Sequence, residues 1–176
     1  EYIVPFALST KMIVLGAMLT PNADGRAAVQ FALSRGRRHW MQRRTQFCRR
    51  RVILSKRIKR YYETVGATVL YGLEGVPLSQ AVLKEVQSFD RRCLRCMLCM
   101  NKHPEETWVG FCRRQHKLLR KVMGNAGLTE LVGQLLAKQH GWAGHAARLP
   151  AEHIAAQWVN AGTMEQWHLS QAIHTN

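Results

Sequence analysis

Acidic residues are scarce in this chain of 176 residues, which contains 11 Asp and Glu against 26 Lys and Arg. Only Asp24 and Asp90 are aspartates, so the sequence offers no convincing pair of carboxylates for a two-metal catalytic site. It also lacks a glycine-rich phosphate loop and a G-x-S-x-G nucleophile elbow. From its own residues we therefore do not expect this chain to be a complete enzyme.

Long apolar runs are missing as well. No stretch approaches the roughly 18 uninterrupted apolar residues of a membrane-spanning helix, so we expect no membrane partner. The five cysteines form an odd number and are crowded into one region, which favours a reducing, intracellular compartment over a disulfide framework. Residues 1–5 (EYIVP) show neither a signal-peptide pattern nor an initiator methionine, so we expect a piece of a longer protein.

The positive charge is concentrated in one stretch without acids. Residues 25–62 carry thirteen Lys and Arg and no Asp or Glu, while the rest of the chain holds thirteen basic and eleven acidic residues. Most charge runs end as solvated helical faces, but such faces usually alternate their charges to form i,i+4 ion pairs. The missing acids favour contact with a polyanion, most commonly the phosphate backbone of a nucleic acid.

The spacing of apolar residues predicts a mainly α fold, a bundle of about five to six helices with a short strand-like stub at the N-terminus. The stub rests on the β-prone run at residues 12–15, which Gly16 ends. Beyond it, apolar residues recur every three or four positions, and Gly and Pro separate the segments. The expected helices cover residues 27–47, 52–70, 78–100, 104–124 and 128–148, followed by a short sixth helix after residue 151.

In the predicted helix 52–70, the apolar residues fall on one stripe. This stripe should face the core, because its spacing matches one side of an α-helix. The positive charges of the same helix are then expected on its exposed side: Lys56, Arg57, Lys59 and Arg60.

Pro104 is expected to open the next helix at its first position, where a missing N–H costs nothing. Glu105 and Glu106 would then lie in the first turn, as the helix dipole favours. The predicted buried stripe of this helix includes Trp108 and Leu118.

Four side chains have a spacing compatible with zinc ligation: Cys96, Cys99, Cys112 and His116. Metal-binding knuckles usually place a turn between paired ligands, whereas Cys96 and Cys99 lie inside a predicted amphipathic helix. A cysteine at a core position of a helix acts as a small apolar residue. We therefore favour the packed-helix interpretation and keep zinc as the weaker alternative.

Three aromatic residues lie in or beside the basic stretch: Trp40, Tyr61 and Tyr62. An aromatic ring among cations can stack on a base or a sugar. It can equally anchor its own helix in the core, and we favour that interpretation.

Three groups of residues, in this order, resemble the region that follows the palm in non-LTR (LINE-type) retrotransposon reverse transcriptases. Residues 14–16 (VLG) and the turn at 22–25 (NADG) are similar to the junction between palm and thumb. Residues 70–74 (LYGLE) and 89–95 (FDRRCLR) look like two further elements of the family, and 142–150 (WAGHAARLP) looks like its "W-x-GH-x-x-R-M-P" signature. The resemblance extends over most of the chain.

This resemblance implies a division into three parts. Residues 1–22 would form the edge of the palm, residues 23–125 a basic, thumb-like helical domain, and residues 126–176 a C-terminal helical extension. The polymerase carboxylates and their magnesium would belong to a palm that this chain lacks, so no cofactor is expected here. The parent protein would be an RNA-directed DNA polymerase that works in the nucleus.

In that family the thumb holds the RNA/DNA template–primer and packs against the palm, so these are the partners that the resemblance implies. Backbone contacts need helices and positive charge but no sequence code. The expected phosphate contacts are Arg37, Arg38, Arg43, Arg44, Arg49, Arg50, Arg51, Lys56, Lys59 and Arg60. The alternative is a stand-alone basic helical module that binds an acidic protein or another polyanion.

Overall fold

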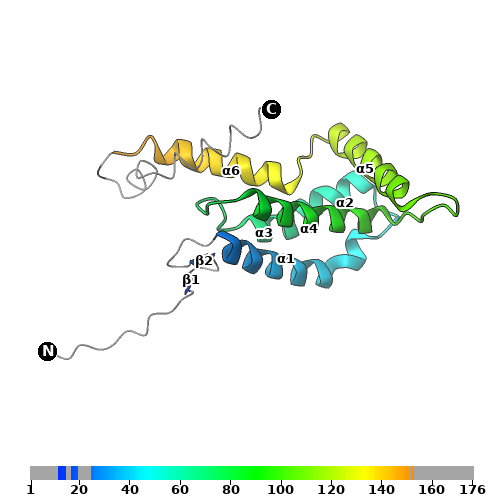
Figure 1. Ribbon diagram of the computed structural model, residues 1–176, viewed down its shortest axis with the longest axis horizontal. Helices are drawn as coiled ribbons and strands as arrows, with labels where there is room; N and C mark the ends of the chain where they lie inside the picture. The colour runs from blue at the N-terminus through cyan, green and yellow to red at the C-terminus, as the bar shows by residue number, and fades with distance from the viewer. Residues whose placement is uncertain (1–11, 15–16, 20–24, 151, 153–176) are drawn as a thin grey trace, which may run out of the picture.

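The computed structural model describes residues 12–14, 17–19, 25–150 and 152, and the fold is mainly α, as expected (Figure 1). The predicted sixth helix and most of the stub at residues 1–22 lie outside the described residues. The elements are β1 (Met12–Val14), β2 (Ala17–Leu19), α1 (Gly25–Phe47), α2 (Leu54–Tyr61), η1 (Tyr62–Gly66), α3 (Ala67–Leu70), α4 (Gln80–Leu98), α5 (Trp108–Asn125) and α6 (Leu131–Ala146).

The strand-like run predicted at the N-terminus is present as a small antiparallel hairpin. β1 pairs with β2, and Ile13 lies opposite Met18 in the register. The hairpin precedes α1, and β2 packs against that helix.

The segments α2, η1 and α3 form one continuous helical stretch, which confirms the helix expected at 52–70. Its middle, η1, is a π-helical turn. Thr64 and Thr68 donate side-chain hydrogen bonds to the carbonyls of Arg60 (2.7 Å) and Thr64 (2.9 Å), a pattern that competes with the normal helical ladder. The stretch ends just before Gly72, whose φ of 78° lies in the left-handed region that glycine tolerates.

The helix expected to begin at Pro104 begins instead at Trp108, so that prediction was wrong. Thr107 is the N-cap, and its Oγ1 accepts a hydrogen bond from the backbone N–H of Gly110 (3.1 Å). The threonine cap satisfies one of the N–H groups in the first turn of α5, and Pro104 lies in a turn further upstream. Glu105 and Glu106 therefore precede the helix and do not lie in its first turn.

The buried stripe predicted for this helix was wrong at two positions. α5 buries Phe111, Gln115, Leu119 and Met123. Trp108 is instead 66% exposed and Leu118 is 37% exposed, so neither of them is buried.

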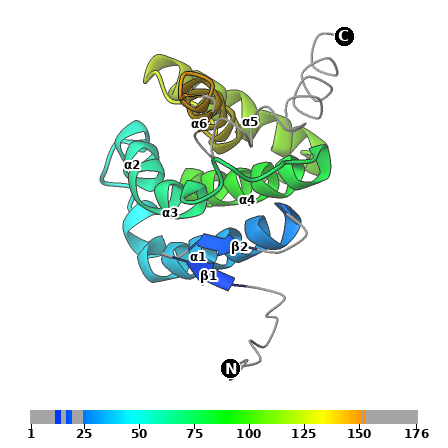
Figure 2. The ribbon, with the colours of Figure 1, turned by 90° about the vertical axis from the view of Figure 1, so that its left-hand side faces the viewer.

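α4 lies at the centre of the bundle in both ribbon views (Figures 1 and 2). α1 packs on one side of it, while α5 and α6 lie on the opposite side. The stretch from α2 to α3 runs beside α4 and also contacts α1. α4 consequently contacts helices on both sides of it, namely α1, α2, α5 and α6.

An aromatic cluster fills the core between α1 and α2. The rings of Trp40 and Phe47 stack with centroids 5.5 Å apart, and Tyr61 meets both of them edge-on. Trp40, Tyr61 and Tyr62 are all buried, which confirms the core interpretation of these rings. None of the three is therefore exposed for stacking on a base.

Gly36, which weakens α1 as an isolated helix, is required by the packing. A Cβ at this position would lie 2.3 Å from Cγ2 of Val69 on α3 and 3.4 Å from the ring of Phe89 on α4. Only a residue without a side chain lets three helices approach so closely.

Asp90 on α4 anchors the start of α6. Its carboxylate accepts hydrogen bonds from the backbone N–H of Leu131 (3.0 Å) and from the hydroxyl of Tyr62 (3.3 Å). Burial raises the pKa of Asp90 to about 6. Leu131 and Leu135 of α6 are fully buried in the same core as the residues of α1 to α4. The division of the chain at residue 125 stays a prediction.

Candidate nucleic-acid interface

Two surface depressions lie between α1 and α4, and basic side chains line both; we call the two depressions together the groove. The first is lined by Arg37 of α1 and by residues 84–92 of α4. The second lies where both helices end. Because the two helices pack against each other, cations from distant parts of the sequence meet in this groove.

The first depression has a net positive charge. Arg37 faces Lys84 and Arg92 across it, and the remaining lining includes Ser88 and the buried Phe89. Its one acid, Glu85, forms an ion pair with Arg26 at 3.3 Å, so its charge is compensated. The three exposed cations can thus act together on an anion.

The second depression combines two arginines with thiols and amides. Arg44 and Arg50 lie at its rim, and Arg50 donates a hydrogen bond to the carbonyl of Cys99 at the end of α4. The other lining residues are Thr45, Cys48, Cys96, Cys99, Met100 and Asn101. The positive character of the groove therefore continues to the ends of both helices.

Arg57 holds these two helix ends together. Its guanidinium donates to the carbonyls of Phe47 (2.9 Å) at the end of α1, Met97 (2.7 Å) in the last turn of α4, and Val52 (2.9 Å). A cation is favoured there because the C-terminal ends of helices carry partial negative charge. The exposed position expected for Arg57 was wrong, since the residue is only 8% exposed.

The ten expected phosphate contacts do not form a single surface. Three of them, Arg37, Arg44 and Arg50, line the groove. The lining of the two depressions does not include the other seven: Arg38, Arg43, Arg49, Arg51, Lys56, Lys59 and Arg60. All ten are exposed except Arg43, which is half-buried.

Sequence reasoning missed the contribution of α4 to this surface. Lys84 and Arg92 lie outside the acid-free stretch and have acids as neighbours in the sequence, such as Glu85 and Asp90. Arg92 belongs to the FDRRCLR segment, which was used only for the resemblance. No pattern within α4 could have identified these two residues, because their position beside Arg37 depends on the packing of α4 against α1.

The cysteines group differently from the proposed zinc set. Cys96 and Cys99 lie near Cys48, whose thiol approaches the carbonyl of Cys96 at 3.5 Å. Cys112 and His116 lie on α5. Within the described part of the chain, no three His, Cys, Asp or Glu side chains are grouped as metal ligands.

Among the residues that the structure describes, no helix has both the length and the apolar composition needed to cross a bilayer. The described surface instead offers a basic groove built from α1 and α4. Comparison of the chain with protein-family models, with curated proteins and with solved structures finds no match. The charges and contacts of the chain's own residues therefore carry the functional argument.

Proposed function

We propose that this chain binds an RNA/DNA duplex through its phosphate backbone, as the thumb of a LINE-type reverse transcriptase. The convergence of exposed cations from α1, from the connection that follows it and from α4 carries this proposal: Arg37, Arg44, Arg50, Lys84 and Arg92. A groove lined in this way matches a charged backbone in shape and sign and needs no base-reading side chains.

The length of the groove supports a contact with several phosphates. Arg37 and Arg44 are separated by about 10 Å along α1, given a rise of about 1.5 Å per residue. Phosphates of one duplex strand repeat about every 3.4 Å along the axis, so these two arginines span roughly three phosphates. The resemblance to the retrotransposon family adds the identity of the duplex as template–primer, a palm as the intramolecular partner and the nucleus as the compartment.

The direct test is fluorescence anisotropy with a labelled RNA/DNA hybrid across a salt series. The groove variant combines Arg37→Gln, Arg44→Gln and Arg92→Gln. We expect it to bind at least tenfold more weakly and to lower the slope of log affinity against log salt by about 2 to 3. The matched control carries Lys56→Gln, Lys59→Gln and Arg60→Gln on α2 and should keep both quantities.

Two outcomes would contradict the proposal. An unchanged salt slope in the groove variant would mean that the duplex does not lie between α1 and α4. Equal affinity of the unmodified protein for heparin and for the hybrid would instead favour the basic interaction module.

A further inference from the structure

Three cysteines meet where α1 and α4 end. Cys48 directly follows α1, Cys96 lies in the last turn of α4, and Cys99 directly follows α4. All three are half-buried and line the second depression of the groove. Cys48 and Cys99 are 51 residues apart in the sequence, so the packing of α1 beside α4 brings them together.

The thiols of Cys48 and Cys99 are direct neighbours. Sγ of Cys48 lies 3.5 Å from the carbonyl oxygen of Cys96, and Sγ of Cys99 lies 3.3 Å from the same oxygen. Sγ of Cys99 also lies 3.5 Å from the carbonyl oxygen of Cys48. Burial raises the pKa of the Cys48 thiol, and the neighbouring Cys99 thiol raises it further through its charge and a hydrogen bond. The Cys96 thiol has a smaller influence on that pKa, so the pair of sulfurs is that of Cys48 and Cys99.

The backbone at Cys99 has a conformation that cysteine rarely adopts. Its φ of 49° lies in the left-handed region, and among the described residues other than glycine it is the one residue with positive φ. Helices commonly end on such a residue, but glycine or asparagine is the usual choice, because a Cβ raises the energy of this conformation. Backbone strain of this kind concentrates at functional positions. The strained position of Cys99 therefore points to a role for its thiol.

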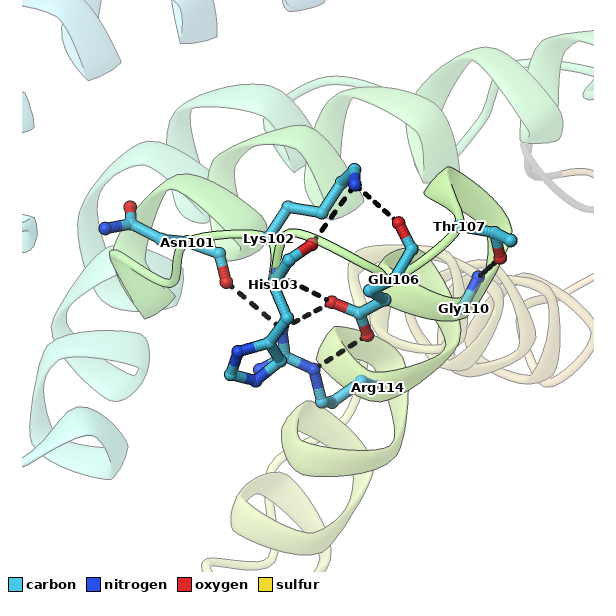
Figure 3. Close-up of polar contacts among 7 residues, drawn as sticks. All are labelled: Asn101, Lys102, His103, Glu106, Thr107, Gly110 and Arg114. Carbon is cyan, nitrogen blue, oxygen red and sulfur yellow. Dashed lines mark hydrogen bonds and ion pairs between the residues drawn. The ribbon is translucent and has the colours of Figure 1, made fainter.

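The segment that follows Cys99 is fixed from the side of α5, as Figure 3 shows. Arg114 of α5 donates to the carbonyl of Asn101 at 3.1 Å and to both carboxylate oxygens of Glu106, at 2.9 and 2.7 Å. The Arg114 hydrogen bonds lower the pKa of Glu106 to about 2, so this ion pair stays charged through the neutral range. Arg50 donates a hydrogen bond to the carbonyl of Cys99 itself. The place of Cys99 is thus fixed by α4 before it, by Asn101 after it and by Arg50 beside it.

Two arginines give the thiols a positive surrounding. Arg44 and Arg50 line the same depression as the thiols of Cys48 and Cys99. A cation beside a thiol stabilises the thiolate, which is the form that reacts with disulfides. The same cations attract the carboxylates of a small anionic disulfide such as glutathione disulfide. The depression therefore brings together a pair of thiols and the charge that attracts such an oxidant.

We propose that Cys48 and Cys99 form a redox pair that reacts with small anionic disulfides, such as glutathione disulfide, and closes into an intramolecular disulfide. One thiolate of the pair attacks a sulfur of the external disulfide, whose S–S bond breaks. A mixed disulfide forms, and one half of the oxidant leaves as a thiolate that takes up a proton. The second thiolate of the pair attacks the protein sulfur of the mixed disulfide, and the other half leaves in the same way. The pair loses two electrons and two protons, and the external disulfide gains both.

The bond would join the C-terminal end of α1 to that of α4. It closes a loop of about 50 residues, which restricts the unfolded chain and so raises the melting temperature. It also draws together the walls of the second depression and hinders the access of a phosphate to Arg44 and Arg50. This second consequence rests on the proposed duplex binding. It predicts that oxidation lowers the salt slope of hybrid binding by about 1, as for the loss of one phosphate contact.

The test is a titration of the full chain with glutathione buffers of increasing glutathione disulfide content. Free thiols are trapped with a maleimide and counted by mass spectrometry. We expect two of the five thiols to disappear together and peptide mapping to find Cys48 joined to Cys99. The oxidised protein should melt about 5–10 °C higher, and dithiothreitol should reverse both changes.

Matched variants separate this pair from the other cysteines. Cys48→Ser should abolish the intramolecular bond, whereas Cys96→Ala and Cys112→Ser should leave it in place. Cys99→Gly should also abolish the bond. In reducing buffer Cys99→Gly should melt about 1–3 °C higher, because glycine adopts the left-handed conformation without strain.

The inference fails on any of three results. The first is the retention of all five free thiols at the highest content of glutathione disulfide. The second is a bond that involves Cys96 in the unmodified protein. The third is a lower melting temperature of reduced Cys99→Gly, which would mean that the thiol serves packing.

Hybrid affinity of the oxidised protein reports separately on the groove. An unchanged salt slope after bond formation would overturn the effect of the bond on duplex binding. An unchanged salt slope in the groove variant would overturn duplex binding itself, and the reaction of the two thiols would not be affected.

Discussion

The helices α1 and α5 lie on opposite sides of α4. Both are basic, but their cations lie on surfaces of different shape. Neither contains an acid, and both are rich in arginine. α1 packs against α3 and α4 together, so its cations border a groove shared with α4. α5 is held by one narrow stripe of four buried residues, so its cations stand on a convex surface. The difference shows that packing partners, and not charge density, decide which shape a basic helix presents.

The same comparison explains why one cation of the acid-free stretch is not available to a ligand. Arg57 sits where the C-terminal ends of α1 and α4 meet, and its hydrogen bonds to carbonyls replace those it would make to water. On the α5 side, Arg114 is likewise engaged, by Glu106. On each side, therefore, an arginine is held by hydrogen bonds to the protein itself.

The largest expected effect is the loss of Arg57. Arg57→Met should lower the free energy of unfolding by about 3–4 kcal/mol, because it leaves the carbonyls of Phe47 and Met97 buried without their donor. Urea unfolding followed by circular dichroism measures it. Arg51→Gln, an exposed arginine of the same stretch, should change stability by less than about 0.5 kcal/mol. Similar values for both variants would mean that Arg57 does not join the helix ends.

The next prediction compares how tightly α1 and α5 are packed, through one glycine substitution in each helix. Gly36→Ala should destabilise the protein by about 2 kcal/mol, since the new methyl group would collide with Val69. Gly124 in α5 has no atom within 4 Å of an added Cβ, so Gly124→Ala should stabilise by about 0.5 kcal/mol through helix propensity. Thermal unfolding of the pair gives the comparison. A neutral Gly36→Ala would show that α1 is not held tightly against α3.

A third effect is a pH dependence of stability on the α6 side of α4. The pKa of Asp90 is raised from 3.8 to about 6 by burial, so the folded state binds more protons than the unfolded state between these values. The stability that Asp90 contributes is therefore full below about pH 4 and falls as pH rises to about 6, by about 1–3 kcal/mol. Above that range it is constant.

Unfolding in urea at pH 4, 5, 6 and 7 tests this sign. Asp90→Asn has no titrating group at this position, so its free energy of unfolding should not show the decline that is due to Asp90. The free energy of unfolding of the unmodified protein, minus that of the variant, should therefore fall as pH rises from 4 to 6. Glu105→Gln, which alters an exposed carboxylate before α5, should leave the decline in place. A difference that grows in the opposite direction would mean that Asp90 is stabilised in its charged form.

Element type was predictable from the sequence because it depends on local periodicity. The apolar residues of the stretch 52–70, among them Ile58 and Tyr61, repeat at helical spacing, and the structure has a helical stretch there. The π-helical turn within it was not predicted from that spacing. The start of α5 was missed because Pro104 and Thr107 are both good helix openers, and only the cap hydrogen bond to Gly110 distinguishes them.

The candidate site was predictable only in part, for a related reason. Arg37, Arg44 and Arg50 were identified from the acid-free stretch, but Lys84 and Arg92 join them only because α4 packs beside α1. The cations of α5 lie outside the acid-free stretch, so the expected phosphate contacts do not include them. Contacts between helices depend on residues far apart in the chain, and a pattern within one helix carries no information about them.

The sequence by itself determined a mainly α protein with its positive charge concentrated in one stretch, because helical periodicity and charge counts are local properties. Only the tertiary structure decided which cations share a surface and which one is buried. Burial of Arg57 depends on its contact with Met97, 40 residues further along the chain, at the end of another helix. Exposure of Trp108 depends on which residues of other helices pack beside the start of α5. Both are consequences of packing, which brings distant residues into contact.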